Sequence, residues 1–294
     1  QNALFEYYAK QSRIPRDNVD EQEPFVTLMD QQIDFISEFK PLHGDMKVLE
    51  VGCAEGFFLQ RLAKRTENEV TIHGVELSEE YIHQARRNIP SATIHESSLE
   101  ETDFADIKFD LVVLRHVFEH LTDPLGALKK IRSVIAPQGT LYIEVPDSEN
   151  IEPSVAVFYH HEHLLYFTRT VLRSYLRSNG FEPQYCERFD QNPLGSGFAY
   201  PVLRSVSVAG EPTSLEQLPR LAEKVYVENI KRNDEYLEST LTPIRKRLKE
   251  LSNGDRRIGL FGAGPHTMDL LGLLKDDDIC WSKMFDNNPN KHGK

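Results

Sequence analysis

The feature that most constrains the fold is a regular alternation of short apolar runs and amphipathic stretches between Lys47 and Val145. Short apolar runs bounded by turn residues are typical of buried parallel strands, and amphipathic stretches between them are typical of crossover helices. The pattern predicts an α/β fold in which right-handed crossovers wind the strands into one sheet. The expected strands are Lys47–Val51, Val70–Glu76, Thr93–Glu96, Phe109–Leu114 and Thr140–Val145, and the expected helices include Glu79–Asn88 and Pro124–Ile135.

Segments on both sides of this region extend the predicted architecture. Apolar residues at helical spacing before Pro41 predict helices that precede the sheet and cover the ligand. Thr168 is a suitable N-cap for a helix over Val171–Asn179, which Gly180 would end. We expect further strands over Phe181–Phe189 and Phe198–Val208, a broken helix over Ser214–Leu251, a strand over Arg257–Phe261 and a helix over Thr267–Leu274.

Composition restricts the class of partner. The net charge of −12 and the pI near 5.4 argue against broad binding to nucleic acid or anionic lipid, because both require a basic surface. The 3 cysteines form no C-x-x-C pair, which argues against a disulfide framework and a cysteine zinc site. No apolar run approaches the ~20 residues of a membrane span, and the start of the chain lacks a signal-peptide pattern. We therefore expect a soluble, cytoplasmic protein.

A glycine turn follows the first expected strand. Gly52 and Gly56 lie between that strand and a helix beginning near Phe57, and glycine permits backbone angles and a close ligand approach that a side chain forbids. Glu76 ends the next strand, where an acidic residue of dinucleotide-binding folds bonds ribose hydroxyls. The acidic Glu50 disfavours a pyrophosphate but suits a ligand that carries an ammonium and a sulfonium. A tight turn without a ligand is the alternative interpretation.

This turn, Glu76 and the run Phe109–His120 together resemble the class I S-adenosylmethionine-dependent methyltransferases. The resemblance implies a Rossmann-like class I methyltransferase sheet and S-adenosyl-L-methionine as cofactor. It also implies that the two glycines border the methionine moiety, that Glu76 grips the ribose and that Ser98-Leu99 lies near the adenine. Ala54 replaces the family's usual central glycine. The expected cofactor-binding residues are Glu50, Gly52, Cys53, Ala54, Gly56, Phe57, Glu76, Leu77, Ser98, Leu99, Arg115 and His116.

Histidines gather beyond the expected carboxyl ends of the strands, where folds of this type bind their substrates. Histidine acts as acid or base near neutral pH, and a neighbouring carboxylate orients it. His163 is the first candidate base, with Glu162 orienting it or sharing its proton. His161 is a second-rank partner, and so is His120, which we expect the fold to bring to this segment.

A second resemblance concerns the acceptor. His161–Thr168 and the following Asn179-Gly-Phe181 resemble sugar C-methyltransferases that act on nucleotide-linked keto sugars, and Ile258–Gly264 and Phe285–Pro289 resemble the start of their C-terminal Rossmann-like domain. Those enzymes usually begin with a cysteine-bound zinc domain, absent here, and carry tyrosine where His160 stands. The resemblance implies methyl transfer to a small sugar-like, nucleotide-linked acceptor, with C-methylation favoured. An O-methyltransferase acting on a carbohydrate or natural product is the alternative.

Other interpretations stay open. His116–His120 matches an inverted zinc-protease motif without an evident third ligand, and His160, His161 and His163 form a metal site only if contiguous ligands converge. His161 and His163 also fit plain loop or core histidines, and we expect no metal. A nicotinamide-dependent oxidoreductase or epimerase is disfavoured by Glu50 and the missing third glycine, and a silent binding subunit by the histidines.

The expected domain organisation has four parts. Residues 1–40 form a helical cap, 41–210 the methyltransferase domain and 211–255 a helical connector, in which the glutamates of Glu235–Glu250 face solvent. Residues 256–294 form a partial Rossmann-like module, which we expect to be cut short because so small a module buries little apolar surface. Its turn Gly262-Ala-Gly264 is compatible with a nucleotide or with a plain turn.

Overall fold

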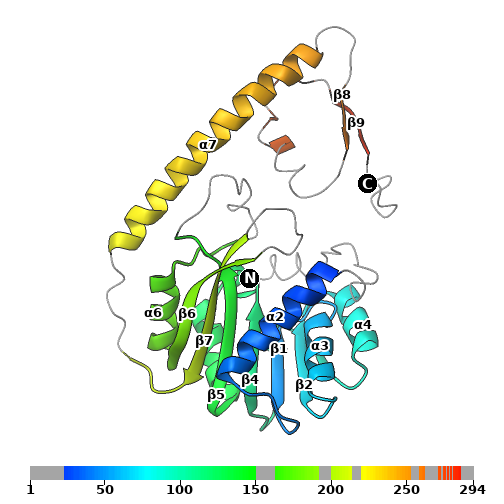
Figure 1. Ribbon diagram of the computed structural model, residues 1–294, viewed down its shortest axis with the longest axis vertical. Coiled ribbons are helices and arrows are strands. Elements are labelled where there is room, and N and C mark those ends of the chain that lie inside the picture. Colours follow the sequence, from blue (N-terminus) through cyan, green and yellow to red (C-terminus); the bar gives the residue numbers. More distant parts are fainter. Residues whose placement is uncertain are drawn as a thin grey trace. The chain divides into compact units, whose positions relative to one another are not determined.

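The structure is a computed structural model (Figure 1). It describes residues 23–149, 163–191, 200–213, 220–252, 258–261, 271–272, 274–275, 277, 279 and 281–285. The described residues up to Lys224 belong to one compact unit, and those from Val225 onwards belong to a second. The four domain boundaries expected from the sequence stay predictions.

A seven-stranded sheet forms the centre of the first unit, in the order β3-β2-β1-β4-β5-β7-β6. The first five strands in sequence run parallel, whereas β7 runs antiparallel to β5, and β6 runs antiparallel to β7. The prediction of an α/β fold with one wound sheet is confirmed. The strands are β1 (Lys47–Val51), β2 (Thr71–Glu76), β3 (Thr93–Glu96), β4 (Phe109–Arg115), β5 (Ile135–Pro146), β6 (Phe181–Gln191) and β7 (Tyr200–Ala209).

Helices cover both faces of the sheet. The side chain of Asp123 accepts a hydrogen bond from Gly126 N and caps α5, and Thr168 accepts one from Val171 N and caps α6, as expected. Gly180 follows α6 with φ of 79°, a left-handed conformation that ends helices and favours glycine. The helices of this unit are α2 (Glu23–Phe39), α3 (Phe57–Arg65), α4 (Glu79–Asn88), η2 (Phe118–His120), α5 (Pro124–Val134) and α6 (Arg169–Ser178).

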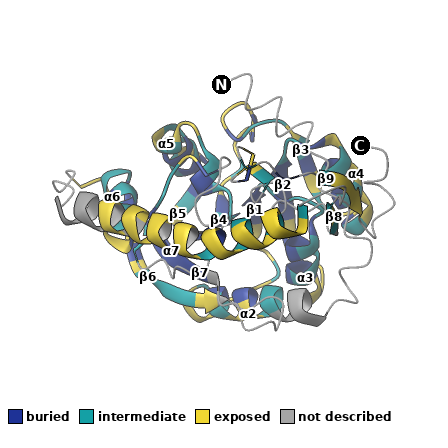
Figure 2. Ribbon diagram, turned by 90° about the horizontal axis from the view of Figure 1, so that it is seen from above, coloured by how far each residue is buried: buried dark blue, intermediate teal, exposed yellow. Residues whose placement is uncertain are grey.

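Successive side chains of the central strand β4 enter two different cores. Leu111 and Val113 pack with apolar residues of α2, α3 and α4, whereas Val112 and Leu114 pack with those of α5 and α6. The strand therefore reads as a continuous apolar run because both of its faces are buried. Figure 2 shows buried residues on the strands and exposed residues on parts of α4 and α5.

The second unit contains most of a long helix and a small sheet. Helix α7 spans Arg220–Ser252, and β8 (Ile258–Phe261) pairs parallel with β9 (Trp281–Phe285). The expected break in this helix is wrong, because α7 continues through Pro243. Leu241 and Leu248, on either side of the proline, pack in one apolar cluster, and this packing offsets the lost backbone hydrogen bond.

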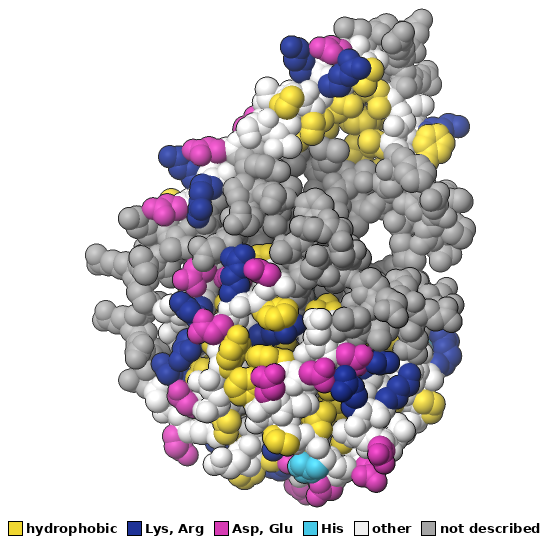
Figure 3. Space-filling view, viewed as in Figure 1, with side chains coloured by type: hydrophobic (Ala, Val, Ile, Leu, Met, Phe, Trp, Pro, Cys, Tyr) yellow, Lys and Arg dark blue, Asp and Glu magenta, His cyan; other side chains and the backbone are white. Residues whose placement is uncertain are grey.

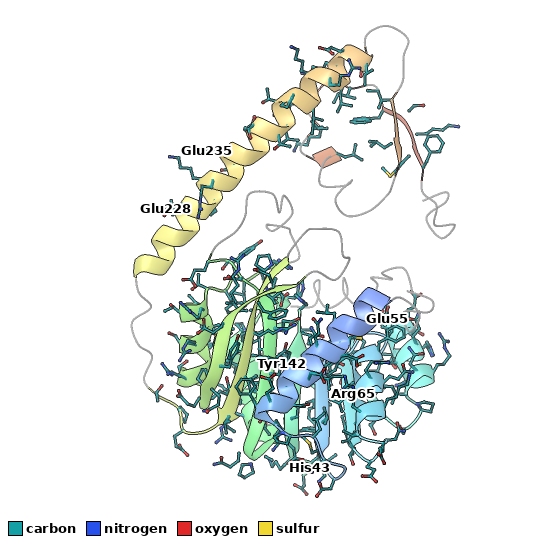
Figure 4. The ribbon with its side chains drawn as sticks, viewed as in Figure 1. His43, Glu55, Arg65, Tyr142, Glu228 and Glu235 are labelled. Atoms are coloured by element: carbon teal, nitrogen blue, oxygen red, sulfur yellow. The ribbon has the colours of Figure 1, made fainter. Side chains whose placement is uncertain are left out.

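The surface of the described residues is charged. Glu228 and Glu235 project from α7 (Figure 4), and both are exposed. Figure 3 shows basic and acidic side chains interspersed on the visible face of the first unit. In the described part of the chain, no helix has the length and apolar character that a membrane crossing requires. Most of the helix expected over Thr267–Leu274 lies outside the described residues.

Candidate functional site

The carboxyl ends of the five parallel strands meet at one edge of the sheet. Val51 is level with Val75 on one side and with Leu114 on the other, and Arg115 is level with Glu144. Ligands of open α/β sheets bind outside this edge. The segments after β1, β2, β3 and β4 that were expected to bind a cofactor therefore lie at the same edge of the sheet.

The turn after β1 requires glycine for two reasons. Gly52, Ala54 and Gly56 have positive φ angles of 68°, 47° and 79°, a region in which side chains are disfavoured. A Cβ atom on Gly52 would also lie 2.4 Å from Val117 Cγ2. Ala54 tolerates its left-handed angle, although glycine suits this position better. The amides of Gly52 and Cys53 donate to Val75 O at 2.8 and 3.2 Å, which fixes the turn against β2.

Glu76 holds two turns together at the end of β2. Its Oε2 accepts a hydrogen bond from Ala54 N at 2.9 Å, and its Oε1 accepts from Leu77 N at 2.8 Å and Ser78 N at 2.9 Å. The sequence suggested only a ribose contact for this carboxylate. A carboxylate has about four acceptor positions, so Glu76 can still accept hydroxyl groups of a ligand.

Glu50 is a fully buried carboxylate beside the glycine turn. Its Oε1 accepts from Arg115 Nε at 2.9 Å, whereas Oε2 has no hydrogen-bond partner among the described residues. Burial raises the pKa of Glu50 to about 7, against the attraction of Arg115. The Arg115 guanidinium stacks 4.3 Å from the centre of the Phe58 ring and donates to Gln32 Oε1 at 3.0 Å. Arg115 therefore contacts protein groups rather than projecting freely towards a ligand.

A buried polar network continues from Gln32 on α2 to the end of β5. Gln32 Nε2 donates to Glu144 Oε1 at 2.7 Å, and Tyr142 Oη donates to Glu144 Oε2 at 2.7 Å. Arg204 on β7 donates from Nε to Glu144 Oε2 at 2.8 Å. Tyr142 lies on the face that α2 covers (Figure 4). Sequence reasoning missed all four residues; a polar Glu144 within an apolar strand was the only local signal.

His116 lies between two buried carboxylates. Its Nδ1 is 3.4 Å from Glu119 Oε1, and its Nε2 is 3.3 Å from Glu144 Oε1. Burial disfavours the charged ring, but the two nearby carboxylates outweigh burial and raise the pKa of His116 to about 10. The same partner holds the pKa of each carboxylate below its usual value, although burial acts in the opposite direction. His116 is thus an imidazolium at neutral pH.

Main-chain bonds join Glu119 to the segment that contains His163. The amides of Leu164 and Leu165 both donate to Glu119 O at 3.0 Å. The His163 and His120 rings lie 5.0 Å apart in an edge-to-face arrangement, and His120 Nε2 is 3.9 Å from Glu119 Oε1. Glu119 is therefore a carboxylate beside these histidines that the sequence analysis did not name as a partner of His163. Glu162, His161 and His160 lie outside the described residues.

The other expected cofactor residues differ in where their side chains lie. Cys53 is buried, and its Sγ would be 2.6 Å from a Cβ on Gly74; Leu99 is buried in the core. A ligand would therefore meet only the main chain of these two residues. Ser98 Oγ accepts from Glu101 N at 3.2 Å, which stabilises the turn after β3. Phe57 is half-buried at the first position of α3.

Comparison with known proteins gives a family match. A family model described as a methyltransferase domain matches residues 21–185, more than half of the chain. A ubiquinone biosynthesis O-methyltransferase from Neisseria meningitidis serogroup C is 28% identical over 145 residues, 46% of this chain and 59% of that protein. An uncharacterized 37.1 kDa protein in transposon TN4556 from Streptomyces fradiae is 30% identical over 106 residues, 35% of this chain and 31% of that protein. The chain thus matches less than two thirds of the length of these relatives.

Solved structures share the fold. A magnesium protoporphyrin IX methyltransferase from Synechocystis with bound SAM has a TM-score of 0.51 at 15% identity and covers 71% of this chain and 96% of its own. An S-adenosylmethionine-dependent methyltransferase from Listeria monocytogenes, described as putative, has a TM-score of 0.51 at 14% identity and covers 63% of this chain and 99% of its own. At such low identities these likenesses establish the Rossmann-like class I architecture alone.

Proposed function

This chain belongs to the methyltransferase-domain family, and from that premise we propose that it transfers the methyl group of S-adenosylmethionine to a small acceptor. The observation that carries the proposal is the family match over residues 21–185 together with the glycine turn and Glu76 at the carboxyl edge of the sheet. A structural neighbour with bound S-adenosylmethionine supports the cofactor. The bound cofactor would supply a methyl group already activated by a sulfonium.

The residues at the turn fit this cofactor. Glu50 Oε2 is buried without a hydrogen-bond partner among the described residues, and a carboxylate suits a cationic ligand better than it suits a pyrophosphate. Glu76 retains acceptor positions for ribose hydroxyls, and the turn around Gly52 would border the methionine moiety. The turn after β3, at Ser98-Leu99, would lie near the adenine.

The acceptor would lie beyond β4 and β5. We assign His163 as the base that removes the acceptor's proton, with His120 and Glu119 close to it. Both nitrogens of His116 lie against carboxylates, so His116 would hold a fixed positive charge there. In this scheme the protein aligns the acceptor with the methyl group and holds one proton. Glu162 and His161 remain candidate partners of the base.

For the acceptor we propose a small sugar-like molecule linked to a nucleotide, with methylation at carbon. This choice rests on the likeness of His161–Thr168 and of the tail motifs to sugar C-methyltransferases. An oxygen acceptor is the alternative, and the similarity to a ubiquinone biosynthesis O-methyltransferase favours it. The two differ in the proton removed: beside a ketone in the first case, from a hydroxyl in the second.

Calorimetric titration with S-adenosylhomocysteine and with NAD tests the cofactor. We expect binding of the first alone; binding of NAD alone would replace this proposal by an oxidoreductase or epimerase. Single-turnover methyl transfer to nucleotide-linked keto sugars and to acceptors that offer only a hydroxyl group then tests the acceptor. His163→Asn should lower the rate by about a hundredfold at unchanged cofactor affinity. The matched control is His83→Asn, at an exposed histidine of α4. A wild-type rate for His163→Asn would remove His163 as the base.

A further inference from the structure

We propose that Glu119, His120 and His163 form a binding site for a divalent transition-metal ion, with Zn²⁺ as the ion that fits best. One candidate ligand atom from each side chain lies within 4.8 Å of the other two. Two imidazoles and one carboxylate are a common set for zinc with one position left open. The three ligands differ from those of the inverted zinc-protease motif, because His116 lies between two carboxylates and His163 comes from a distant segment of the chain.

The main chain holds the ligand segments together. Glu119 O accepts hydrogen bonds from Leu164 N and Leu165 N, directly after His163. His120 N in turn donates to Val117 O at 3.0 Å, within the short helix η2. The backbones that carry the three ligands are therefore fixed before any ion binds, which reduces the entropy lost on binding.

The carboxylate of Glu119 has the environment of a cation ligand. It is 1% exposed, and neither of its oxygens accepts a close hydrogen bond from the described residues. Glu119 Oε1 lies 3.4 Å from His116 Nδ1 and 3.9 Å from His120 Nε2, and the other ring nitrogen of His116 lies beside Glu144. A buried carboxylate is costly unless it is paired, and the one charge of His116 is shared between Glu119 and Glu144, so an ion bound between Glu119 and the two imidazoles would complete the pairing.

The spacing of the ligands requires only side-chain adjustment. Ligands at zinc-like bond lengths lie about 3.4 Å apart in a tetrahedral site. Glu119 Oε1 and His120 Nε2 are already 3.9 Å apart, and no distance among the three ligand atoms exceeds 4.8 Å. Small rotations of the side chains would close the difference. His116, in contact with the Glu119 carboxylate, would orient it from the outer shell.

The site lies at the end of β4, where the acceptor would bind. An ion on His163 would occupy the lone pair that the proposed base requires, so metal-loaded protein should not transfer methyl groups. This consequence rests on the proposed function, whereas metal binding itself does not. The two ideas can therefore fail separately.

The test uses the full chain, stripped of metal by a chelator and titrated with Zn²⁺ against a chromophoric chelator. Co²⁺ serves as a spectroscopic probe, because it gives more intense visible absorption bands in sites of low coordination number than in water. We expect one strong site per chain. His120→Asn and His163→Asn should each weaken Zn²⁺ binding by at least about tenfold and change the Co²⁺ spectrum. His83→Asn, at an exposed histidine beside Glu79, is the matched control and should bind like wild type.

Several outcomes would overturn the metal site. These are no binding by wild type, binding unchanged in both His120→Asn and His163→Asn, or equal loss in the His83→Asn control. Thermal unfolding of each variant separates ligand loss from misfolding. If the protein binds no zinc but the metal-free form transfers methyl groups, the metal site is wrong and the proposed function stands. If the protein binds zinc but the metal-free form transfers no methyl group, the metal site stands and the proposed base is contradicted.

Discussion

At the scale of single residues, the turn after β1 combines a backbone requirement with a packing requirement. Gly52 has φ of 68°, and a Cβ there would approach Val117 Cγ2 to 2.4 Å. Val117 follows β4, so the turn after β1 packs against the segment after β4 at this glycine. The backbone conformation and the neighbouring side chain both exclude a larger residue.

Gly52→Ala should therefore destabilise the protein by about 1–3 kcal/mol and weaken binding of S-adenosylhomocysteine. Denaturant unfolding and calorimetry measure the two effects. Val117→Ala is the control, and the double variant should recover the part of the loss that comes from the clash. Wild-type stability of Gly52→Ala would show that the left-handed turn is wrong.

Glu76→Ala should weaken binding of S-adenosylhomocysteine by about 1–3 kcal/mol, because a ribose acceptor and the acceptor for three backbone amides are lost together. Calorimetry on the folded variant measures the loss. Glu79→Ala, at an exposed glutamate on α4, is the matched control. Unchanged affinity in Glu76→Ala would place the ribose elsewhere.

At the scale of elements, polar bonds connect α2 to β4 and β5. Its Gln32 donates to Glu144 and accepts from Arg115, which pairs with Glu50. A neutral amide suits this place because it can donate to a carboxylate and accept from a guanidinium at once. Helix α2 is thus fixed by polar bonds as well as by its apolar face.

Gln32→Leu should lower the free energy of unfolding by about 1–3 kcal/mol, because the buried Glu144 carboxylate and the partly buried Arg115 guanidinium each lose a partner. Gln31→Leu is the matched control on the same helix; Gln31 is exposed, and its change should stay within about 0.5 kcal/mol. Denaturant titration compares the two. Equal stabilities would mean that the bridge contributes nothing to the fold.

The strands β2 and β3 carry a pH-sensitive pair. His73 Nδ1 lies 3.0 Å from His95 Nε2, and burial lowers the pKa of both below the usual value of 6.5. At these two histidines the unfolded chain therefore binds protons more readily than the folded one. The free energy of unfolding is unaffected by the pair above about pH 6.5 and decreases as the pH falls below that value. His95→Gln should flatten the decline in stability on acidification, and His83→Gln should leave it unchanged. Parallel declines for wild type and His95→Gln would contradict this assignment.

At the scale of the whole molecule, the described parts of the candidate site belong to the first unit. The polar network includes Arg204 on β7, and among the described residues the two apolar cores of this unit extend no further along the chain than Ala209. The described residues of the second unit have their own apolar cluster, which includes Leu241 and Leu274. Cofactor binding should therefore not depend on the second unit.

A chain shortened after Thr213 should fold cooperatively and bind S-adenosylhomocysteine within about threefold of the full chain, because a domain with its own core can fold alone. Calorimetry and thermal unfolding check this expectation. Loss of folding would show that the removed residues complete the core. Loss of binding in a folded chain would assign them a direct part in the site.

The sequence determined the features that depend on neighbouring residues. Strand and helix positions follow from local periodicity, so Glu79–Asn88 was predicted with its observed bounds, and Thr168 identified the start of α6 through its own hydrogen bond. The glycine turn and Glu76 were recognisable for the same reason. These features need only short-range backbone geometry, which local residue types set.

Only the tertiary structure decided which distant groups meet. The contacts of Glu119 with the segment after His163, and of Gln32 with Glu144, depend on strand order and on helix packing, which no local pattern encodes. Pro243 shows the same limit, because its local preference to break α7 is overridden by packing on both sides. Buried polar contacts of this kind arise when the fold removes water from groups far apart in the chain, so each must find its partner in three dimensions.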